Sequence, residues 1–392
     1  MKKMYSIFGI LMIGMLLFAA CGGTPAQATE ATVTISLWHS YHAGGGEEAT
    51  INKLVADYMT EHPNVKVDVL EVPFDQIFNK YNTETAAGGG PDMITFPNDN
   101  LYQQVQDGLI LDITDKLQGK LDKVSSAVVA GMTVDGKYCV VPGIIKPVGV
   151  YYNKDTVATP PATTDELMSA VQGGLRVGLI SGIYFQFGWA GVFGGKIWDD
   201  TGKCVADQGG VAEAWQYLLD LKAAGATFDA DGAKIASLFK EGQLDLIIDG
   251  PWMFGEYNTT FGDKLGVAPW PTGPNGGKGA PLAGVDNWHI NPNSKNVDTA
   301  LDLALYNFGQ AGSQAYSDTA LDPMVRTDVT PKDERIGTFA QIAADGTPRP
   351  LAKFLNGFWG PFGDNYTAMI EGQMAPADAV TAACTAMNEA NK

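Results

Sequence analysis

The sequence predicts an α/β protein built from mostly parallel β-sheets flanked by helices. Strand-like and helix-like segments alternate through the N-terminal part of the chain, an order that requires crossover helices between neighbouring parallel strands. A length of 392 residues is sufficient for two domains of ordinary size. The hydrophobic fraction of 45% and the mean hydropathy of −0.04 are typical of a chain that folds in water around a sizeable core.

The first elements follow from hydrophobic periodicity. Residues 31–37 (ATVTISL) are β-branched and partly alternating, which indicates a strand. Residues 47–61 place apolar side chains at helical spacing and are followed by His62-Pro63, which ends the helix. The same rules predict, in order, a strand over 65–72, a helix over 74–87, a glycine turn over 88–91, a buried strand over 92–96 and a helix from 101.

The second half of the chain shows the same kinds of segment. Residues 148–152 (VGVYY) and 244–249 (LDLIID) predict short strands, and the second of these is stopped by Gly250-Pro251. The segment PPATTDE at 160–166 is typical of a helix start with a capping residue. Residues 211–224 predict a helix whose Trp215 faces the core, and the Gly- and Pro-rich 271–281 predicts a long loop.

Charge excludes several classes of protein. The chain has 26 Lys and Arg against 44 Asp and Glu, a net charge of −18, and its pI is near 4.5. Such a chain repels phosphate backbones and anionic lipid surfaces, so we expect no nucleic-acid partner. Only 18% of the residues are charged, and 47 glycines and 21 prolines interrupt the sequence, which excludes a coiled coil.

The N-terminus predicts export. Two lysines precede a short apolar run, and Ala-Ala-Cys21-Gly follows it, so residues 1–20 are predicted to be a signal peptide rather than a membrane span, which needs roughly 20 apolar residues. The segment resembles a bacterial lipoprotein signal, in which Cys21 becomes the lipidated first residue. An ordinary signal cut near Ala28 is the alternative. Residues 21–31, small and polar, predict a flexible tether, so we expect the mature protein outside the membrane and held there by its lipid alone.

Seven short segments carry a family resemblance. In chain order they are Trp38-His39-Ser40-Tyr41, Pro91-Asp92-Met93-Ile94, Asp135-Gly136-Lys137-Tyr138 with Val141-Pro142, Tyr151-Tyr152-Asn153-Lys154-Asp155, residues 160–167, Phe239-Lys240-Glu241-Gly242, and Asp249-Gly250-Pro251-Trp252. Their order and spacing resemble the extracellular solute-binding proteins (family 1) of sugar ABC importers, and most of all maltose- and maltodextrin-binding proteins. The similarity extends from about residue 32 to the C-terminus.

The resemblance implies the periplasmic-binding-protein fold of two α/β lobes, with a ligand in the cleft between them. Three hinge crossings would fall near residues 143–146, 282–285 and 324–327. One lobe would then comprise 32–144 plus 284–325, and the other 147–282 plus 328–392. Closure over a ligand would be a hinge motion at these crossings.

A sugar site needs exposed aromatic rings and planar polar side chains, because a sugar offers an apolar ring face and a rim of hydroxyl groups. Trp38 ends the first predicted strand, where ligands bind in open α/β sheets, and Tyr41 belongs to the same motif. Phe96 matches a cleft aromatic of the family. After it come three candidates for hydroxyl contacts, one of which could instead cap a helix: Asn98, Asp99 and Asn100.

The second half supplies the remaining candidates by resemblance. Lys146 stands where maltose binders place a cleft acid, which leaves the identity of the sugar open; a surface lysine of the hinge is the alternative. The expected ligand contacts are Tyr184, Phe187, Trp252, Asp286, Trp288 and Trp359. Four aromatic residues are expected to be structural: Phe185, Trp189, Trp198 and Trp270.

Neither a metal nor a disulfide is fixed by the sequence. His39 and His42 resemble a metal pair, but no third ligand lies near them in the sequence, so we expect no metal and no cofactor. Beyond Cys21 three cysteines remain, and Cys204 and Cys384 fall in the same implied lobe. They could form a disulfide, or Cys139 and these two could all be small buried residues.

We therefore expect a monomeric, lipid-anchored protein that captures an oligosaccharide, an α-glucoside of the maltose or maltodextrin type, and passes it to an ABC permease without catalysis. An exported glycosidase is one alternative and would need two opposed carboxylates, for which Asp99 and Asp286 are the candidates. A binding protein for another solute, such as a peptide, polyamine or metal, is the other.

Overall fold

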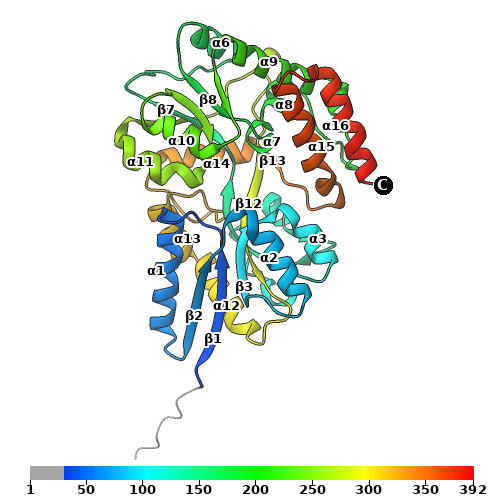
Figure 1. Ribbon diagram of the computed structural model, residues 1–392. Coiled ribbons are helices and arrows are strands. Elements are labelled where there is room, and N and C mark those ends of the chain that lie inside the picture. Colours follow the sequence, from blue (N-terminus) through cyan, green and yellow to red (C-terminus); the bar gives the residue numbers. More distant parts are fainter. Residues whose placement is uncertain (1–30) are drawn as a thin grey trace, which may run out of the picture.

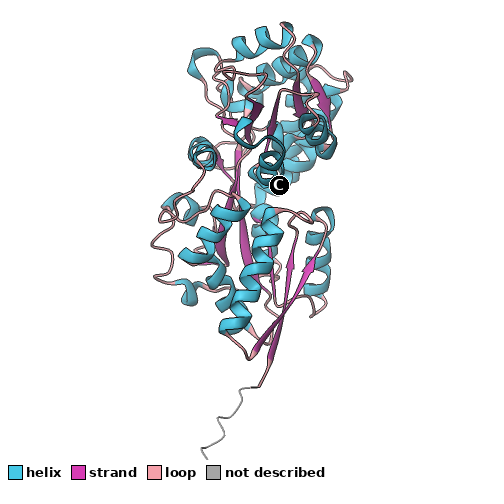
Figure 2. Cartoon of the chain, turned by 90° about the vertical axis from the view of Figure 1, so that its left-hand side faces the viewer, coloured by secondary structure: helices cyan, strands magenta, loops and turns pink. Residues whose placement is uncertain are grey.

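A computed structural model describes residues 31–392, which form two lobes stacked end to end (Figure 1). The predicted signal peptide, Cys21 and all of the tether but its last residue lie outside the described residues. Each lobe has one main β-sheet with helices packed on both sides, as the side view shows (Figure 2). The chain is therefore an α/β protein of the predicted two-lobed architecture.

The N-terminal lobe is built on a sheet of order β13-β12-β3-β1-β2, with β6 paired to β12. Its strand β1 (Val33–His39) pairs in parallel with β2 (Val65–Glu71) and β3 (Met93–Pro97), as the alternation of strands and helices predicts. The other strands of this sheet are β6 (Val140–Lys146), β12 (Leu282–Ile290) and β13 (Thr347–Pro348). β12 runs antiparallel to β3 and β6.

The C-terminal lobe has a five-stranded sheet of order β11-β7-β10-β8-β9. β8 (Val177–Ile180), β9 (Thr227–Asp229) and β10 (Leu246–Asp249) are parallel, whereas β7 (Gly149–Asn153) runs antiparallel to β10 and β11 (Leu265–Ala268). Each sheet is thus mixed rather than uniformly parallel. The antiparallel pairings in these sheets are those of β12 with β3 and β6 and those of β7 with β10 and β11.

Helices surround both sheets. The helices of the N-terminal lobe are α1 (Gly46–Glu61), α2 (Phe74–Ala86), α3 (Leu101–Gln106), α4 (Thr114–Leu117), α5 (Ser126–Ala130), α12 (Val297–Phe308) and α13 (Gln310–Ala315), with a small hairpin of β4 (Thr133–Val134) and β5 (Lys137–Tyr138). Those of the C-terminal lobe are α6 (Thr164–Gln172), α7 (Ile183–Gln186), α8 (Trp189–Val192), α9 (Val211–Ala224), α10 (Gly232–Lys240), α11 (Phe254–Phe261), α14 (Glu334–Asp345), α15 (Lys353–Ile370) and α16 (Pro376–Ala390). Within residues 31–392, none of the helices combines the length and the apolar character that crossing a membrane requires.

Two separate hydrophobic cores correspond to the two lobes. One core draws its buried residues from 35–144 and 285–325, and the other from 148–282 and 336–387. Trp215 is buried in the second core, as its helical spacing predicts. Because the cores separate close to the implied hinge crossings, we propose the lobe boundaries given by the resemblance.

The three crossings lie side by side. The amide of Ile145 donates to the carbonyl oxygen of Pro323 at 2.9 Å, and the amide of Val325 donates to that of Gly143 at 3.2 Å. Lys146 is the register partner of Gly284 on β12. The hinge is therefore a set of three chain segments joined by hydrogen bonds rather than three independent linkers.

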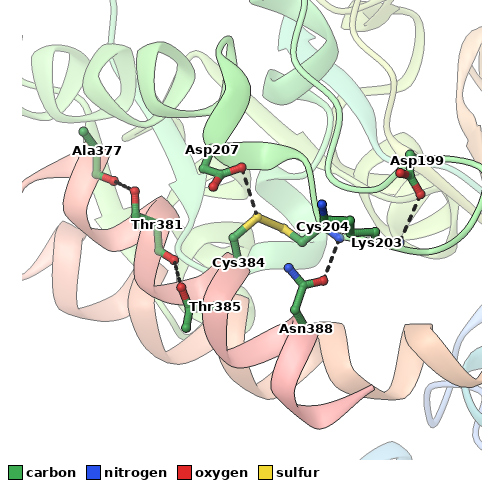
Figure 3. Close-up of a disulfide and its surroundings, with 9 residues drawn as sticks. All are labelled: Asp199, Lys203, Cys204, Asp207, Ala377, Thr381, Cys384, Thr385 and Asn388. Atoms are coloured by element: carbon green, nitrogen blue, oxygen red, sulfur yellow. Dashed lines mark hydrogen bonds between the residues drawn. A yellow bond between two sulfur atoms is a disulfide. The ribbon is translucent and has the colours of Figure 1, made fainter. Parts of the chain in front are cut away.

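A disulfide joins Cys204 to Cys384 on α16, and the backbone amide of Cys204 donates to the Oδ1 atom of Asn388 at 3.0 Å (Figure 3). The structure thus selects the disulfide from the two possibilities that the sequence left open. Within the described part of the chain, Cys139 is the remaining cysteine, and it is a buried free thiol.

A candidate ligand cavity between the lobes

A cavity of about 570 Å³ lies where the two lobes meet, and its size is typical of sites for small ligands. Residues of both lobes and of the hinge line it: Ser40, Tyr41, His42, Glu47, Phe74, Pro97, Asp99, Lys146, Tyr184, Phe185, Trp252, Gly284, Asp286, Arg349 and Trp359. Seven of the predicted site residues are among them, namely Tyr41, Asp99, Lys146, Tyr184, Trp252, Asp286 and Trp359.

The ends of parallel strands build the N-terminal wall. Tyr41 follows β1, and Asp99 lies on the short 3₁₀ helix Asn98–Asn100 that follows β3. Since β1 and β3 are neighbouring parallel strands, their carboxyl ends meet at the same edge of the sheet. Phe74 begins α2 after the end of β2 and adds an aromatic ring that is 55% exposed. An exposed ring of this size beside a cavity is available to a ligand.

Aromatic rings dominate the C-terminal wall. Tyr184 and Phe185 lie on α7 after β8, and Trp252 lies on the 3₁₀ helix Pro251–Met253 after β10. Trp359 comes from α15. The Trp252 ring lies 6.3 Å from the Tyr184 ring and 6.2 Å from the Phe185 ring, measured between centroids. Tyr184, Phe185 and Trp252 therefore form a cluster of rings, of the kind that the faces of sugar rings require.

Lys146 lies at the centre of a buried cluster of charges in the hinge. Its ammonium group contacts the carboxylate of Glu47 and lies 3.5 Å from Asp286 Oδ2 and 3.4 Å from Asp322 Oδ1. All four side chains are less than one tenth exposed. Asp286 directly follows the second crossing and Asp322 lies two residues before the third, so Lys146 connects the neighbourhood of all three crossings to α1. The alternative of a surface lysine is excluded.

One positive charge among three carboxylates leaves an excess of negative charge in this cluster. Burial raises the pKa of Asp286 from 3.8 to about 6, and the neighbouring carboxylates of Asp322 and Asp99 add to this effect, whereas Lys146 opposes it. Burial also raises the pKa of Asp322. Among residues 31–392, no group hydrogen-bonds to the buried Oδ1 atom of Asp286. This atom is an acceptor that a ligand hydroxyl group could satisfy.

Six predicted site residues do not line the cavity that residues 31–392 form; the structure places five of them in the lobe interiors and Asn100 on the half-exposed 3₁₀ helix beside Asp99. Trp38 and Trp288 are buried in the N-terminal core, and so is Phe96, whose ring stacks on that of His289. Asn98 is buried and accepts a hydrogen bond from the amide of Val285 at 3.2 Å. Phe187 packs against Phe358 in the other core.

These placements have a common physical reason. Successive side chains of a strand point to opposite faces of the sheet, so a residue near a strand end can face the core instead of the cleft. Phe187 and Phe185 show the same effect on a helix: the two residues point in different directions, and Phe185, which we expected to be structural, is the one that lines the cavity. The expected structural role of Trp189 and Trp270 agrees with their burial.

Eight of the lining residues were not predicted as ligand contacts from the sequence: Ser40, His42, Glu47, Phe74, Pro97, Phe185, Gly284 and Arg349. Ser40 and His42 flank Tyr41, so their position after the first strand was a usable signal. Phe74 lies two residues after the end of a predicted strand and could have been found in the same way. Arg349 had no local signal, because it lies between two prolines in a segment without periodicity.

The structure offers no metal site in the part of the chain that it describes, since no group of three His, Cys, Asp or Glu side chains there could hold an ion. His39 instead accepts a hydrogen bond from the amide of Tyr41 at its Nδ1 atom, over 3.2 Å. Burial lowers the pKa of His39, which favours the neutral ring that such an acceptor requires.

Two α/β lobes joined by three crossings, with a ligand-sized cavity between them, define a two-lobed solute-binding protein. The chain belongs to the bacterial extracellular solute-binding proteins: residues 53–338, well over half of its length, match this family. As a member of an extracellular family, it acts outside the cytoplasm.

Curated relatives are similar over most of their length. The galactooligosaccharide-binding protein of Bacillus subtilis is 25% identical, over 97% of this chain and 95% of that protein. The maltodextrin-binding protein MdxE of the same species is 28% identical, over 81% of this chain and 80% of that protein. A relative from Streptococcus pneumoniae, 24% identical over 76% of this chain and 74% of that protein, is a maltooligosaccharide ABC transporter solute-binding lipoprotein.

Solved structures show the same fold. The GacH receptor of Streptomyces glaucescens, solved unliganded and with acarbose, matches with a TM-score of 0.85 at 21% identity, over 92% of this chain and 99% of that one. The maltotriose-binding protein of Thermus thermophilus, solved with maltotriose, matches with a TM-score of 0.82 at 24% identity, over 91% of this chain and 99% of that one.

Proposed function

We propose that this protein is the oligosaccharide receptor of an ABC importer and that its ligand is an α-glucoside of the maltose or maltodextrin type. The ligand would bind in the cavity between the lobes, hinge closure would enclose it, and a permease would receive it. The protein would act as a monomer held to the membrane by a lipid on Cys21. It would need no cofactor and would leave the sugar chemically unchanged.

The observation that carries this proposal is the composition of the cavity wall. Tyr184, Trp252 and Trp359 provide aromatic surface from one lobe, and Tyr41 and Phe74 provide it from the other. Stacking one sugar face of roughly 50 Å² contributes on the order of 1 kcal/mol, so several rings are needed for useful affinity. A cavity with aromatic rings on both sides supports a ligand of more than one sugar unit.

Polar groups at the edge of the cavity support the same ligand class. Asp99, Lys146, Asp286 and Arg349 offer carboxylate acceptors and cationic donors around the aromatic wall. Such groups suit hydroxyl groups, which both donate and accept hydrogen bonds. The names of the curated relatives, which bind galactooligosaccharides and maltodextrins, support an oligosaccharide and leave its identity between these two kinds.

Lys146 bears on the choice of sugar. It occupies a position where maltose binders are expected to carry an acid, but its charge is compensated by Glu47, Asp286 and Asp322. An acidic acceptor is therefore still present near this point, supplied by Asp286 from another strand. This arrangement supports a ligand with a related but not identical pattern of hydroxyl groups.

The test is a titration of the soluble form, starting after Cys21, followed by tryptophan fluorescence. The panel would contain maltose, maltotriose, a galactooligosaccharide, trehalose, cellobiose and xylobiose. We expect a saturable change with an α-glucoside and none with cellobiose or xylobiose. A response to the galactooligosaccharide alone would show that the ligand is of this type and not an α-glucoside. No fluorescence change with any sugar of the panel would contradict sugar binding.

A glycosidase is the second candidate, and one observation favours it. The pKa of Asp286 is raised to about 6, as a general acid would need. The second carboxylate, Asp99, is however bound to the guanidinium of Arg349. An ion-paired carboxylate is a poor nucleophile or base, so we favour binding. Chromatography of maltotriose incubated with the protein distinguishes the two, because hydrolysis products would support the enzyme.

A further inference from the structure

Arg349 occupies an unusual place in the cavity. It follows β13 directly and lines the cavity, yet it is only 3% exposed. Its guanidinium group lies against the backbone of Gly284 on β12, where a Cβ atom would come within 2.9 Å of the Nη2 atom. The hinge strand therefore leaves space for this side chain by means of a glycine.

Both lobes hold the guanidinium group. On the N-terminal side, its Nη1 atom donates to the carboxylate of Asp99 and lies 3.4 Å from Asn98 Oδ1. On the C-terminal side, its Cζ atom lies 5.5 Å from the centroid of the Tyr184 ring and 5.6 Å from that of Trp359, within the range of cation–π attraction. Arg349 thus connects an acid of one lobe to the aromatic wall of the other.

Two hydrogen-bond donors on this side of the cavity have no acceptor among the described residues. In residues 31–392, neither the Nε atom of Arg349 nor the Nε1 atom of Trp359 has a hydrogen-bond partner, although both atoms are buried and both residues line the cavity. Buried N–H groups without acceptors are unfavourable and uncommon. The side chain of Arg349 is fixed by Asp99 and by two rings, so its free N–H cannot turn to another acceptor without breaking these contacts.

We propose that Arg349 is a ligand-binding residue that selects a neutral sugar: its Nε–H and the indole N–H of Trp359 donate to oxygen atoms of the bound oligosaccharide. This inference rests on the proposed function and adds to it the group that recognises these oxygen atoms. Neutral oxygen atoms are favoured because Asp99 already compensates the charge of Arg349. An anionic group on the ligand would also face Asp286.

The ion pair between Arg349 and Asp99 should also affect the closure of the two lobes. A sugar bound to Arg349 is connected through the guanidinium to Asp99 of the opposite lobe. Arg349 therefore takes part both in sugar contact and in holding the two lobes together around the ligand, and its removal should weaken binding by more than the loss of one surface contact would.

The test compares variants in the same maltotriose titration. Arg349→Lys keeps a cation for Asp99 but lacks the planar Nε–H, and the double variant D99N/R349M removes the ion pair without leaving an unpaired charge. We expect each to weaken maltotriose binding by about tenfold or more, as the loss of a charge-assisted hydrogen bond does. A matched control is D333N/R335M, since Arg335 forms an ion pair with Asp333 and lies over Phe254, away from the cavity. It should lower the melting temperature without changing the affinity.

The outcomes separate this inference from the proposed function. If the unaltered protein binds maltotriose and Arg349→Lys binds it equally well, Arg349 has only a structural role and the inference is overturned while the function stands. If the unaltered protein binds no sugar of the panel, the proposed function fails and the inference fails with it. Loss of affinity in both Arg349 variants, with retained melting temperatures, supports the inference.

Discussion

The hydroxyl group of Tyr184 donates a hydrogen bond to the backbone carbonyl oxygen of Lys146. Tyr184 belongs to the aromatic wall of the C-terminal lobe, and Lys146 is the last residue of the first hinge strand. The same lysine is bound through its side chain to Glu47, Asp286 and Asp322. One residue thus connects the wall of the cavity, the three crossings and the first helix of the N-terminal lobe, so movement at the hinge and the position of a cavity ring are mechanically linked.

Replacement of Tyr184 by Phe tests this link. The ring and its stacking surface stay, whereas the hydrogen bond to the Lys146 carbonyl is lost, so we expect maltotriose affinity to fall by about three- to tenfold. Fluorescence titration measures the effect. Tyr217→Phe is a control in the same lobe, because its hydroxyl group also donates to a backbone carbonyl but lies outside the cavity lining. Equal affinities for both variants and the unaltered protein would contradict the link.

Trp252 should be the strongest single contact of the aromatic wall. Replacement by Ala removes a ring that lines the cavity and is only half-buried, so maltotriose binding should weaken by at least about tenfold. The melting temperature without ligand should change little, because Trp252 packs against the edge of the lobe core and is not one of its buried members. Trp198→Ala removes a half-buried tryptophan of the same lobe outside this cavity and serves as the control. Retained affinity in Trp252→Ala would mean that the ligand lies elsewhere.

The orientation of Trp252 depends on a glycine. A Cβ atom on Gly250 would lie 2.1 Å from ring atoms of Trp252, so the ring packs directly on the glycine backbone. Gly250→Ala must therefore displace the ring, and we expect a loss of maltotriose affinity of about the same size as in Trp252→Ala. Gly255→Ala, in α11, is the matched control, because its new methyl group would meet nothing within 4 Å in the described chain. Unchanged binding by Gly250→Ala would show that the ring is free to move.

Asp286 should make the stability of the folded protein depend on pH in a predictable direction. Its pKa is raised from 3.8 to about 6, so between these values the folded protein binds this proton more tightly than the unfolded chain does. The contribution of Asp286 to stability therefore increases as the pH falls from 7 towards 4 and is lost as the pH rises through 6. Chemical denaturation at several pH values should show the unaltered protein gaining stability relative to Asp286→Asn on acidification. If the unfolding free energies of the two proteins change equally with pH, this role of Asp286 is contradicted.

Protonation of Asp286 should also affect the ligand. A carboxylate accepts a hydrogen bond at Oδ1 from a sugar hydroxyl, whereas the protonated acid has less capacity to accept. Maltotriose affinity should therefore decline below pH 6 in the unaltered protein and vary less in Asp286→Asn, measured in the same titrations.

The disulfide should stabilise the C-terminal lobe. Cys204 and Cys384 are separated by 180 residues in the sequence, and closing so long a loop restricts the unfolded chain. The double variant C204A/C384A should lose about 2–4 kcal/mol of unfolding free energy and keep its maltotriose affinity. Reductant should lower the melting temperature of the unaltered protein and leave that of the double variant unchanged. An equal response of the two proteins to reductant would show that the effect does not come from this disulfide.

The resemblance predicted more of the site than periodicity did. Tyr41, Asp99, Tyr184, Trp252 and Trp359 line the cavity, and each of them follows a strand or matches a motif of the family; their contact with a ligand stays a prediction. Phe96 and Trp288 were expected at the same edge but are buried, because the face on which a strand residue points depends on the register of the sheet and not on its distance from the strand end.

Composition and periodicity within short segments were sufficient to predict the α/β class, the acidic charge and the order of strands and helices. The sequence also located most of the aromatic surface, through motifs that span a few residues. The contacts between residues distant in the chain became visible only in the folded protein: Arg349 with Asp99, Lys146 with Asp322, and Cys204 with Cys384. Such pairs leave no local pattern in the sequence, because their residues come into contact only when the two lobes and the three crossings assemble.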